Sequence, residues 1–262
     1  MDSMDTYWAD RSALEWQVEL GADEAIGDTP VNRYEIPEKL AKPAASAVSP
    51  AMTPPEPAEP VKVDAIAVAR ELAQSAADLD ALRTALDAFD MCEPKRAARN
   101  TVFAQGDPAA RVLIVGEAPD RDVDRAGTPF AGAAQQLLGR MFDAIGMGQD
   151  VEDPTARIYT IAPIPWRSPA QPQPHELDMM KPFLERHITL ANPDIVLVMG
   201  NTACQMLLGR AGVSRLRGNW TEALGRPVLP MLHPVALIQN PSAKRDAWAD
   251  LLALKAKLKG SS

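Results

Sequence analysis

Val112-Leu-Ile-Val-Gly-Glu-Ala-Pro119, followed closely by Gly127-Thr-Pro-Phe-Ala-Gly132, is the stretch of sequence that decides the fold. A short apolar run that stops at a Gly and a Pro is typical of a buried strand ending in a tight loop. Ligands of open α/β sheets bind at such carboxyl ends of strands. The second Gly/Pro cluster carries a single aromatic residue, Phe130, among small residues. Together the two pieces predict a pocket for a flat ring at one edge of a sheet.

Three more apolar runs resemble the first, and helical patterns separate them. Predicted strands cover residues 112–115, 158–161, 195–199 and 228–232, and predicted helices cover residues 133–145, 175–190, 202–208 and 243–258. Strands that alternate with helices favour a parallel sheet with helices on both faces. We therefore predict a three-layer α/β/α fold with a central, mostly parallel sheet of four to five strands.

The N-terminal quarter of the chain differs in composition from the rest. Residues 1–40 predict an acidic leader with a helix over residues 7–26, and residues 41–63 predict a Pro/Ala-rich linker. Residues 64–262 are the predicted folded domain, which begins with a helix over residues 64–89.

Charge is distributed unevenly along the chain. Residues 1–64 contain 13 acidic and five basic side chains, whereas residues 201–262 contain nine basic and three acidic ones. The overall net charge of −8 therefore conceals a C-terminal part that can face phosphates.

Composition excludes several classes of protein. No stretch approaches the roughly 20 apolar residues of a membrane span, and the N-terminus has no apolar segment of a signal peptide. The two cysteines, Cys92 and Cys204, cannot make a disulfide framework. We expect a cytoplasmic monomer that does not bind membranes.

Four predicted strand ends carry residues that can do chemistry, namely Glu117, Trp166, Asn201 and His233. The carboxyl ends of parallel strands lie on one side of a sheet, so Glu117, Trp166 and His233 are predicted to converge with Phe130. Each also has a structural interpretation: Glu117 as a helix N-cap or surface carboxylate, Phe130 as a core residue, Trp166 as a loop anchor, and His233 as a structural histidine. His175 and His187 fall in a predicted helix, where we expect them to be solvated.

At this point the motifs resemble the uracil-DNA glycosylase superfamily, and within it the bacterial family built around an iron–sulfur cluster, in its alphaproteobacterial branch. The similarity covers roughly residues 85–258. Its pieces include Gly116-Glu-Ala-Pro119, Gly127-x-Pro-Phe-x-Gly132, Arg217-Gly218, His233-Pro234 and Lys244-Arg-x-x-Trp-x-Asp-Leu251. The resemblance implies base excision repair of DNA, with hydrolysis of the N-glycosidic bond of uracil or another deaminated or damaged base.

The resemblance also implies roles for residues at the matching positions. A base must leave the duplex before an enzyme can reach its glycosidic bond, and Phe130 matches the ring on which the base stacks. His233 matches the donor that stabilises charge on uracil O2, and Glu117 matches a water-positioning carboxylate. The implied base pocket also contains Gly116, Ala118, Pro119 and Ala162. The implied DNA contacts are Arg217, Pro234, Lys244, Arg245 and, as a wedge into the duplex, Leu237.

Departures from the family pattern fall within the site. Asp120 stands in place of a Gly, Val123 in place of a carboxylate, and Gln239 in place of an Arg. The Asn that reads the base corresponds to Ala162, which offers neither donor nor acceptor. The four cluster cysteines correspond to Phe89, Cys92, Trp166 and Met180. A cubane cluster needs four ligands, so we predict that the protein has no cofactor and no metal, and that side chains fill the cluster's volume.

These departures leave three functions open. The protein is an active glycosylase that is weak on uracil, or a glycosylase for another damaged base read by backbone groups or by Asp120. Alternatively, it is a catalytically degenerate DNA-binding or repair-scaffold protein whose acidic leader binds repair proteins. Fold alone does not decide between them.

Overall fold

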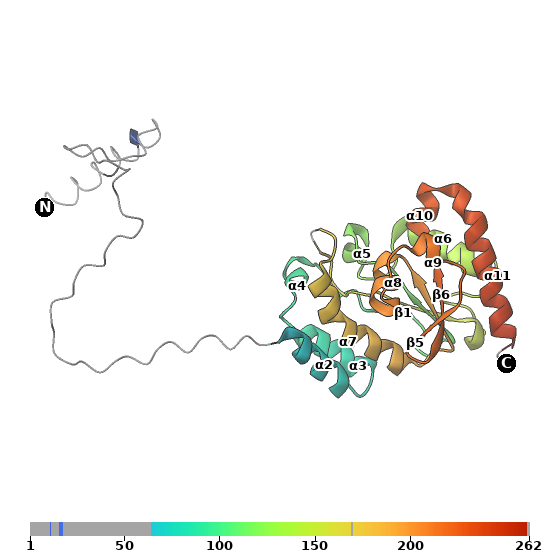
Figure 1. Ribbon diagram of the computed structural model, residues 1–262, viewed down its shortest axis with the longest axis horizontal. Helices are drawn as coiled ribbons and strands as arrows, with labels where there is room; N and C mark the ends of the chain where they lie inside the picture. Colours follow the sequence, from blue (N-terminus) through green and yellow to red (C-terminus); the bar gives the residue numbers. More distant parts are fainter. Residues whose placement is uncertain (1–10, 12–15, 18–63, 169, 261–262) are drawn as a thin grey trace, which may run out of the picture. The chain divides into compact units, whose positions relative to one another are not determined.

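The computed structural model describes residues 11, 16–17, 64–168 and 170–260. Chain contacts divide the protein into two units, residues 1–59 and 60–262, and the second of these carries the fold (Figure 1). The predicted linker over residues 41–63 and most of the predicted helix over residues 7–26 lie outside the described residues.

The second unit is built on a six-stranded sheet with the strand order β1-β3-β2-β4-β6-β5. The strands are β1 (Ala104–Gly106), β2 (Val112–Val115), β3 (Ile158–Ile161), β4 (Ile195–Met199), β5 (Thr221–Ala223) and β6 (Arg226–Met231). β3, β2, β4 and β6 are parallel, whereas β1 and β5 pair antiparallel at the two edges. The sheet is thus mixed, and not mostly parallel with four to five strands as predicted. The sequence pattern missed β1 and β5 because each has only three residues, too few to show alternation.

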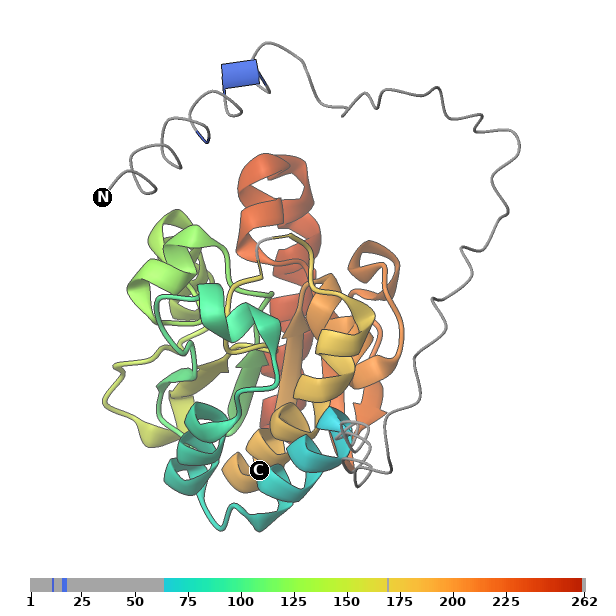
Figure 2. The same cartoon turned by 90° about the vertical axis from the view of Figure 1, so that its left-hand side faces the viewer.

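Helices lie on both faces of this sheet (Figures 1 and 2). They are α2 (Ala65–Ser75), α3 (Leu79–Ala88), α4 (Glu93–Ala97), α5 (Arg121–Ala126), α6 (Gly132–Asp143), α7 (Pro174–Ala191), α8 (Asn201–Leu208), α9 (Val213–Leu216), α10 (Pro234–Gln239) and α11 (Lys244–Gly260), with 3-10 turns η1 (Pro154–Ala156) and η2 (Pro241–Ala243).

Alternate residues of the parallel strands enter two separate cores. Leu113 and Val115 of β2 pack in the core that includes residues of α2, α3, α7 and α8. Val112 and Ile114 pack in the core that includes residues of α6 and α11. Every residue of β2, β3 and β4 is buried, as expected for strands covered on both faces. The three-layer α/β/α arrangement is therefore as predicted.

The single helix predicted over residues 64–89 is wrong in one respect: two helices, α2 and α3, stand in its place. Ala76, after α2, is extended, and the Asp78 side chain accepts a hydrogen bond of 2.8 Å from the backbone N–H of Ala81 to begin α3. An Asp side chain at such a position starts a new helix. Both helices pack alongside α7 (Figure 2).

His187 of α7 is buried, not solvated as predicted from its place in a helix. Its Nε2 lies 2.9 Å from the Tyr159 hydroxyl, and its ring stacks on Phe103 with ring centres 4.4 Å apart. Burial lowers the pKa of His187 to about 3. The histidine is therefore a neutral core residue.

We expect acid to destabilise the fold through this histidine. Because the pKa of His187 is lower in the folded protein than the ordinary value near 6.5, the unfolded chain binds the additional proton as pH falls. The free energy of unfolding should drop by about 2 kcal/mol between pH 7 and pH 5 from this group. Urea unfolding across this range measures the drop. The stability of His187→Gln should depend less steeply on pH than that of wild type, whereas His175→Gln, at the exposed start of α7, should match wild type. Equal slopes for all three proteins would contradict the assignment.

Candidate active site

A cavity of about 730 Å³ opens where the parallel strands end. Its walls are the loop after β2, from Glu117 to Arg121, the segment after β3 that includes Arg167 and Ser168, and the first turn of α8. Phe130, Trp166 and His233 are not among the described residues that line it. The predicted convergence therefore divides into three parts: Glu117 faces the cavity, Phe130 and His233 pair with each other, and Trp166 enters the core.

Phe130 and His233 form a nearly parallel ring pair. Their ring centres lie 5.1 Å apart and their planes differ by 12°. Phe130 is only 1% exposed, and a Cβ at Gly116 would come within 3.2 Å of its Cζ, so only glycine leaves this ring its ordinary contact distance. A third ring between the two would need ring centres about 7 Å apart. A base can therefore stack on this face of Phe130 only if the His233 ring moves.

The environment of His233 makes it a neutral hydrogen-bond donor. Its Nδ1 accepts a hydrogen bond of 3.3 Å from the backbone N–H of Val235, at the start of α10. An accepting Nδ1 places the ring proton on Nε2. Burial lowers the pKa of His233 to about 4, and the nearby charge of Asp120 opposes this only in part. At neutral pH the ring thus offers an Nε2–H without carrying a charge.

The Glu117 carboxylate is bound to the first turn of α8. It accepts hydrogen bonds from the backbone N–H groups of Asn201 at 2.7 Å and Thr202 at 3.1 Å, and from its own neighbour Ala118 at 3.1 Å. Gly200 makes this possible: its φ is +122°, and a Cβ there would lie 2.2 Å from Glu117 Oε2. The contacts favour the structural interpretation of Glu117 as a helix cap, because they occupy both of its oxygens.

Glu117→Gln is expected to lower the free energy of unfolding by about 1–3 kcal/mol. An amide has one accepting oxygen, and its NH₂ group would face a backbone N–H that also donates. Urea unfolding of the variant measures the loss, with Glu222→Gln on the exposed edge strand β5 as the matched control. Unchanged stability would show that the carboxylate does not hold α8 in place.

The loop after Glu117 also uses its carboxylates for structure. Asp120 accepts from the backbone N–H of Val123 at 2.9 Å and so caps α5. Asp124 is 3% exposed and accepts from the backbone N–H groups of Arg99 at 2.8 Å and Asn100 at 3.2 Å. Val123, at the position of the family's carboxylate, is half-buried and apolar. Asp120 and Asp124 are thus hydrogen-bonded to backbone, whereas the exposed Asp122 pairs with the Arg125 side chain at 3.6 Å.

The four positions that correspond to cluster cysteines lie together in one core. Phe89, Cys92, Trp166 and Met180 are each at most 2% exposed. The Lys95 ammonium lies 5.6 Å from the centre of the Trp166 ring and donates a hydrogen bond of 3.1 Å to the backbone carbonyl of Phe89. Bulky side chains and one cation thus pack together around these four positions.

These residues do not fit an iron–sulfur cluster. Three of the four offer no thiol, and Cys92 has a pKa raised to about 12 by burial, with Glu176 and Glu93 adding to the shift. One thiol cannot supply the four ligands that such a cluster needs. Among the described residues, no group of three or more His, Cys, Asp or Glu side chains is placed to hold a metal ion.

Two of the predicted DNA contacts have a role inside the protein: Arg217 is paired with a carboxylate, and Leu237 is buried. Arg217 makes a bidentate pair with Asp250, with Nε–Oδ2 at 3.0 Å and Nη2–Oδ1 at 2.5 Å, and donates to the backbone carbonyl of Asp246 at 2.7 Å. Leu237 is only 1% exposed, so it does not project as a wedge. The exposed apolar side chains of α10 are Val235 and Ile238, at 36% and 43%. In the helix α10, Leu237 therefore faces the protein interior, and Val235 and Ile238 face outward. The sequence motif did not reveal this orientation.

The remaining predicted contacts differ in exposure. Lys244 and Arg245, at the start of α11, are exposed, whereas Pro234 is buried at the first position of α10. Lys244 and Arg245 are thus free to meet a phosphate, and Pro234 shapes the loop after His233.

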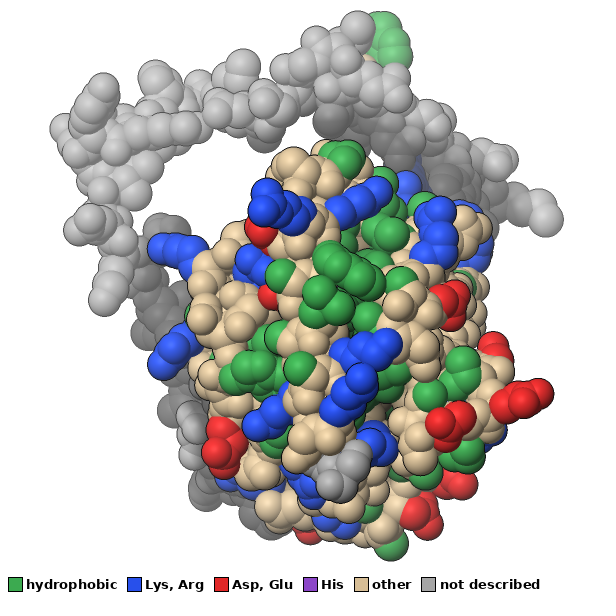
Figure 3. All heavy atoms as spheres, turned by 90° about the vertical axis from the view of Figure 1, so that its right-hand side faces the viewer, with side chains coloured by type: hydrophobic (Ala, Val, Ile, Leu, Met, Phe, Trp, Pro, Cys, Tyr) green, Lys and Arg blue, Asp and Glu red, His purple; other side chains and the backbone are tan. Residues whose placement is uncertain are grey.

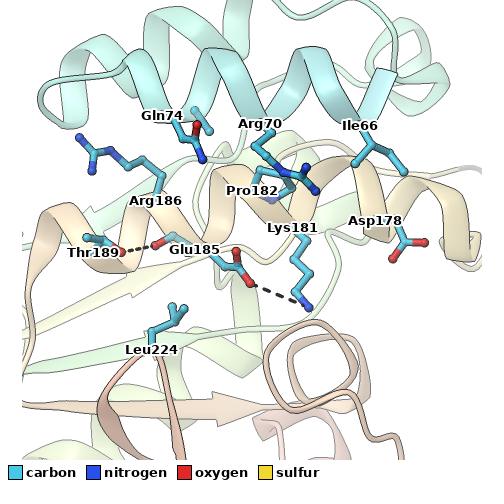
Figure 4. Close-up of a pocket in the computed structure, with 11 residues that line it drawn as sticks. Ile66, Arg70, Gln74, Asp178, Lys181, Pro182, Glu185, Arg186, Thr189 and Leu224 are labelled. Carbon is cyan, nitrogen blue, oxygen red and sulfur yellow. Dashed lines mark hydrogen bonds and ion pairs between the residues drawn. The ribbon is translucent and has the colours of Figure 1, made fainter. Parts of the chain in front are cut away.

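A second cavity, of about 620 Å³, lies between α2 and α7 and belongs to a different part of the domain (Figure 4). Leu224, from the turn between β5 and β6, lines it, so it lies toward the amino end of β6 and away from the strand ends described above. Its Lys181 and Glu185 form an ion pair of 3.9 Å. No residue of the Glu117 loop is among the described residues that line it. We do not assign it to the site.

Among the described residues, no helix is both long and apolar enough to cross a membrane.

Comparison with known proteins places these features in a family. A family model described as the uracil DNA glycosylase superfamily matches residues 103–252. The type-4 uracil-DNA glycosylase of Thermotoga maritima is 31% identical over 148 residues, which cover 55% of this chain and 74% of that protein. The type-4 uracil-DNA glycosylase of Archaeoglobus fulgidus is 29% identical over 170 residues, covering 61% and 82%. A DNA polymerase of Bacillus phage SP01 is 26% identical over 181 residues, covering 68% of this chain and 18% of the polymerase. This chain belongs to the uracil DNA glycosylase superfamily, as its motifs predicted.

Proposed function

We propose that the protein is a DNA base-excision glycosylase that hydrolyses the N-glycosidic bond of uracil, or of another deaminated or damaged base, and that its activity on uracil is weak. The observation that carries the proposal is the pair of Phe130 and a neutral His233 beside the strand-end cavity. A stacking ring and a neutral donor are the two groups that excision of a flipped base needs most. The similarity to proteins named type-4 uracil-DNA glycosylases supports it.

The chemistry follows from these two residues. The base enters over Phe130 as the His233 ring moves aside. The C1′–N1 bond breaks and its electron pair leaves with the base, while a water oxygen bonds to C1′ and its proton passes through solvent to the departing base anion. The His233 Nε2–H donates to uracil O2, where negative charge grows. A neutral donor is sufficient because it bonds more strongly as that charge develops.

Two replacements account for weak activity on uracil. Ala162 follows β3 next to the Glu117 loop, since the Gly116 N–H donates to the Ile161 carbonyl at 2.9 Å. An alanine there leaves the uracil edge without a partner, and such sites lose much of their discrimination. Val123 cannot accept a proton from the attacking water. The Glu117 carboxylate is engaged with α8.

A catalytically degenerate protein that binds DNA is the second candidate. It is favoured by the same engagement of Glu117, and by the direct contact of the Phe130 and His233 rings, which leaves no space for a base between them. In this case the exposed Lys244 and Arg245 and the acidic leader would serve binding to DNA and to repair proteins.

We further propose that the fold does not use an iron–sulfur cluster and that the protein acts as a monomer in the cytoplasm. The packed side chains at Phe89, Trp166 and Met180 support the first part. Iron analysis and a visible spectrum of anaerobically purified protein test the absence of a cluster. Iron bound at a stoichiometric level, with absorbance at about 400 nm from Fe–S charge transfer, would refute that absence.

One assay separates the two candidate functions. The purified chain is incubated with a uracil-containing single strand and with a U:G duplex, and abasic sites are cleaved by alkali. Glycosylase activity gives cleaved product, and the rate of its formation should fall by about a hundredfold or more in His233→Ala. If stoichiometric protein gives no product while it still binds the DNA, the degenerate candidate replaces the first.

A further inference from the structure

An apolar groove of about 350 Å³ lies between α6, α10 and α11, apart from the cavity at the strand ends. Figure 3 looks onto the face that carries α11, where hydrophobic side chains lie among Lys and Arg side chains. Trp248 lines the groove and is 43% exposed. The other apolar lining residues are Leu137, Met141, Ala144, Leu237, Ala247 and Leu251. The groove thus offers a large aromatic side chain, in part open to solvent, beside an aliphatic wall.

The charge around this groove is positive. Arg140 and Lys244 line it, and none of the described residues that line it is acidic. The two acidic residues nearby on α11, Asp246 and Asp250, are paired with Arg217. The groove is therefore suited to an apolar group that carries negative charge at its ends.

The groove is continuous with the helix that follows His233. Leu237 of α10 forms part of its wall, and the exposed side chains of Val235 and Ile238 lie on the same short helix. Lys244 begins α11 directly after the 3-10 turn η2 that follows α10. A DNA strand held at His233 and α10 would therefore lie close to the groove.

We propose that this groove binds an unpaired nucleotide of the DNA next to the excised base. Its base stacks on Trp248 against the aliphatic wall, and Arg140 and Lys244 contact the flanking phosphates. An aromatic platform with a basic rim is the composition of single-strand binding sites. The proposal rests on the proposed function in that DNA is the ligand, and it does not depend on excision.

The test uses the full chain and two uracil-free, fluorescein-labelled DNAs, a paired duplex and the same duplex with a short unpaired loop. We expect wild-type protein to prefer the looped DNA, and Trp248→Ala to weaken its binding by about tenfold, with a smaller effect on the paired duplex. Trp248→Phe should retain most of the affinity. Lys244→Ala should reduce the slope of log Kd against the logarithm of salt concentration by about one. Trp220→Ala is the control, since this Trp is also exposed but stands before β5.

Four outcomes would overturn the proposal. In the first, folded Trp248→Ala binds the looped DNA as tightly as wild type. In the second, Trp220→Ala loses as much affinity as Trp248→Ala. In the third, wild-type protein shows no preference for the looped DNA. In the fourth, a short Asp/Leu peptide saturates the groove without displacing looped DNA, which would identify an acidic protein segment as the ligand. Peptide binding is seen as a change in tryptophan fluorescence that the Trp248→Phe variant lacks. If wild-type protein binds neither DNA, the proposed function fails as well, whereas excision of uracil with unchanged Trp248→Ala binding removes this proposal alone.

Discussion

Replacing Ala162 by Asn and Val123 by Glu in the same chain is expected to raise uracil excision by about a hundredfold or more. The Asn would supply an amide that donates to uracil O4 and accepts from N3–H. The Glu would supply a carboxylate on α5 that can take the proton of the attacking water. In the proposed site, Phe130 supplies the stacking ring and His233 the neutral donor. The gain arises because the two missing interactions concern uracil O4 and N3–H and the attacking water, whereas His233 donates to uracil O2.

Single-turnover excision on a U:G duplex measures this gain, with the two single variants assayed beside the double variant. Ala162→Gln is the matched control, because its longer side chain carries the same amide to a different place. His233→Ala in the restored background should abolish the gain. If the double variant excises no faster than wild type while both proteins bind DNA equally, then the base pocket differs in more than these two residues.

The parallel part of the fold was predictable because its strands are fully buried. Val112–Val115 and Ile195–Met199 are uninterrupted apolar runs. The helices predicted after the four parallel strands have ends within two residues of those in the structure. β1 and β5 carry no such pattern, since three residues at a sheet edge are only partly buried. Local apolar density identifies central strands and misses short edges.

The sequence predicted which residues lie near the strand ends but not their hydrogen-bond partners. Sequence motifs pointed to Phe130 and His233, and the structure brings them into contact. The same motifs assigned Glu117 to water and Arg217 to DNA, because charged residues in a motif suggest function. Both instead bind groups far away in the sequence, 84 and 33 residues apart, which no local pattern reports. The partner of a charged motif residue is therefore known only once the fold is known.

Arg217→Ala is expected to lower the free energy of unfolding by about 3–5 kcal/mol. The Asp250 side chain is only 3% exposed, and Arg217 supplies both of its charged hydrogen bonds. Removing the guanidinium leaves a buried carboxylate without a counter-charge, which costs far more than the loss of a surface ion pair. Urea unfolding at pH 7 measures the loss. Arg215→Ala, at an exposed position of the same short helix α9, is the matched control.

The pH dependence of the same variant identifies the cause of the loss. Burial already raises the pKa of Asp250 in the folded protein, although the bond from Arg217 opposes the shift. Without Arg217 the pKa rises further, so the folded variant holds a proton that the unfolded chain releases, and stability is lost as pH rises. The loss in free energy of unfolding relative to wild type should therefore be smaller at about pH 4 than at pH 7. Asp250→Asn added to Arg217→Ala removes the charge and should recover part of the stability at pH 7. A deficit that is equal at both pH values, and unchanged by Asp250→Asn, would show that lost packing of the Arg217 side chain, and not the isolated charge of Asp250, is the cause.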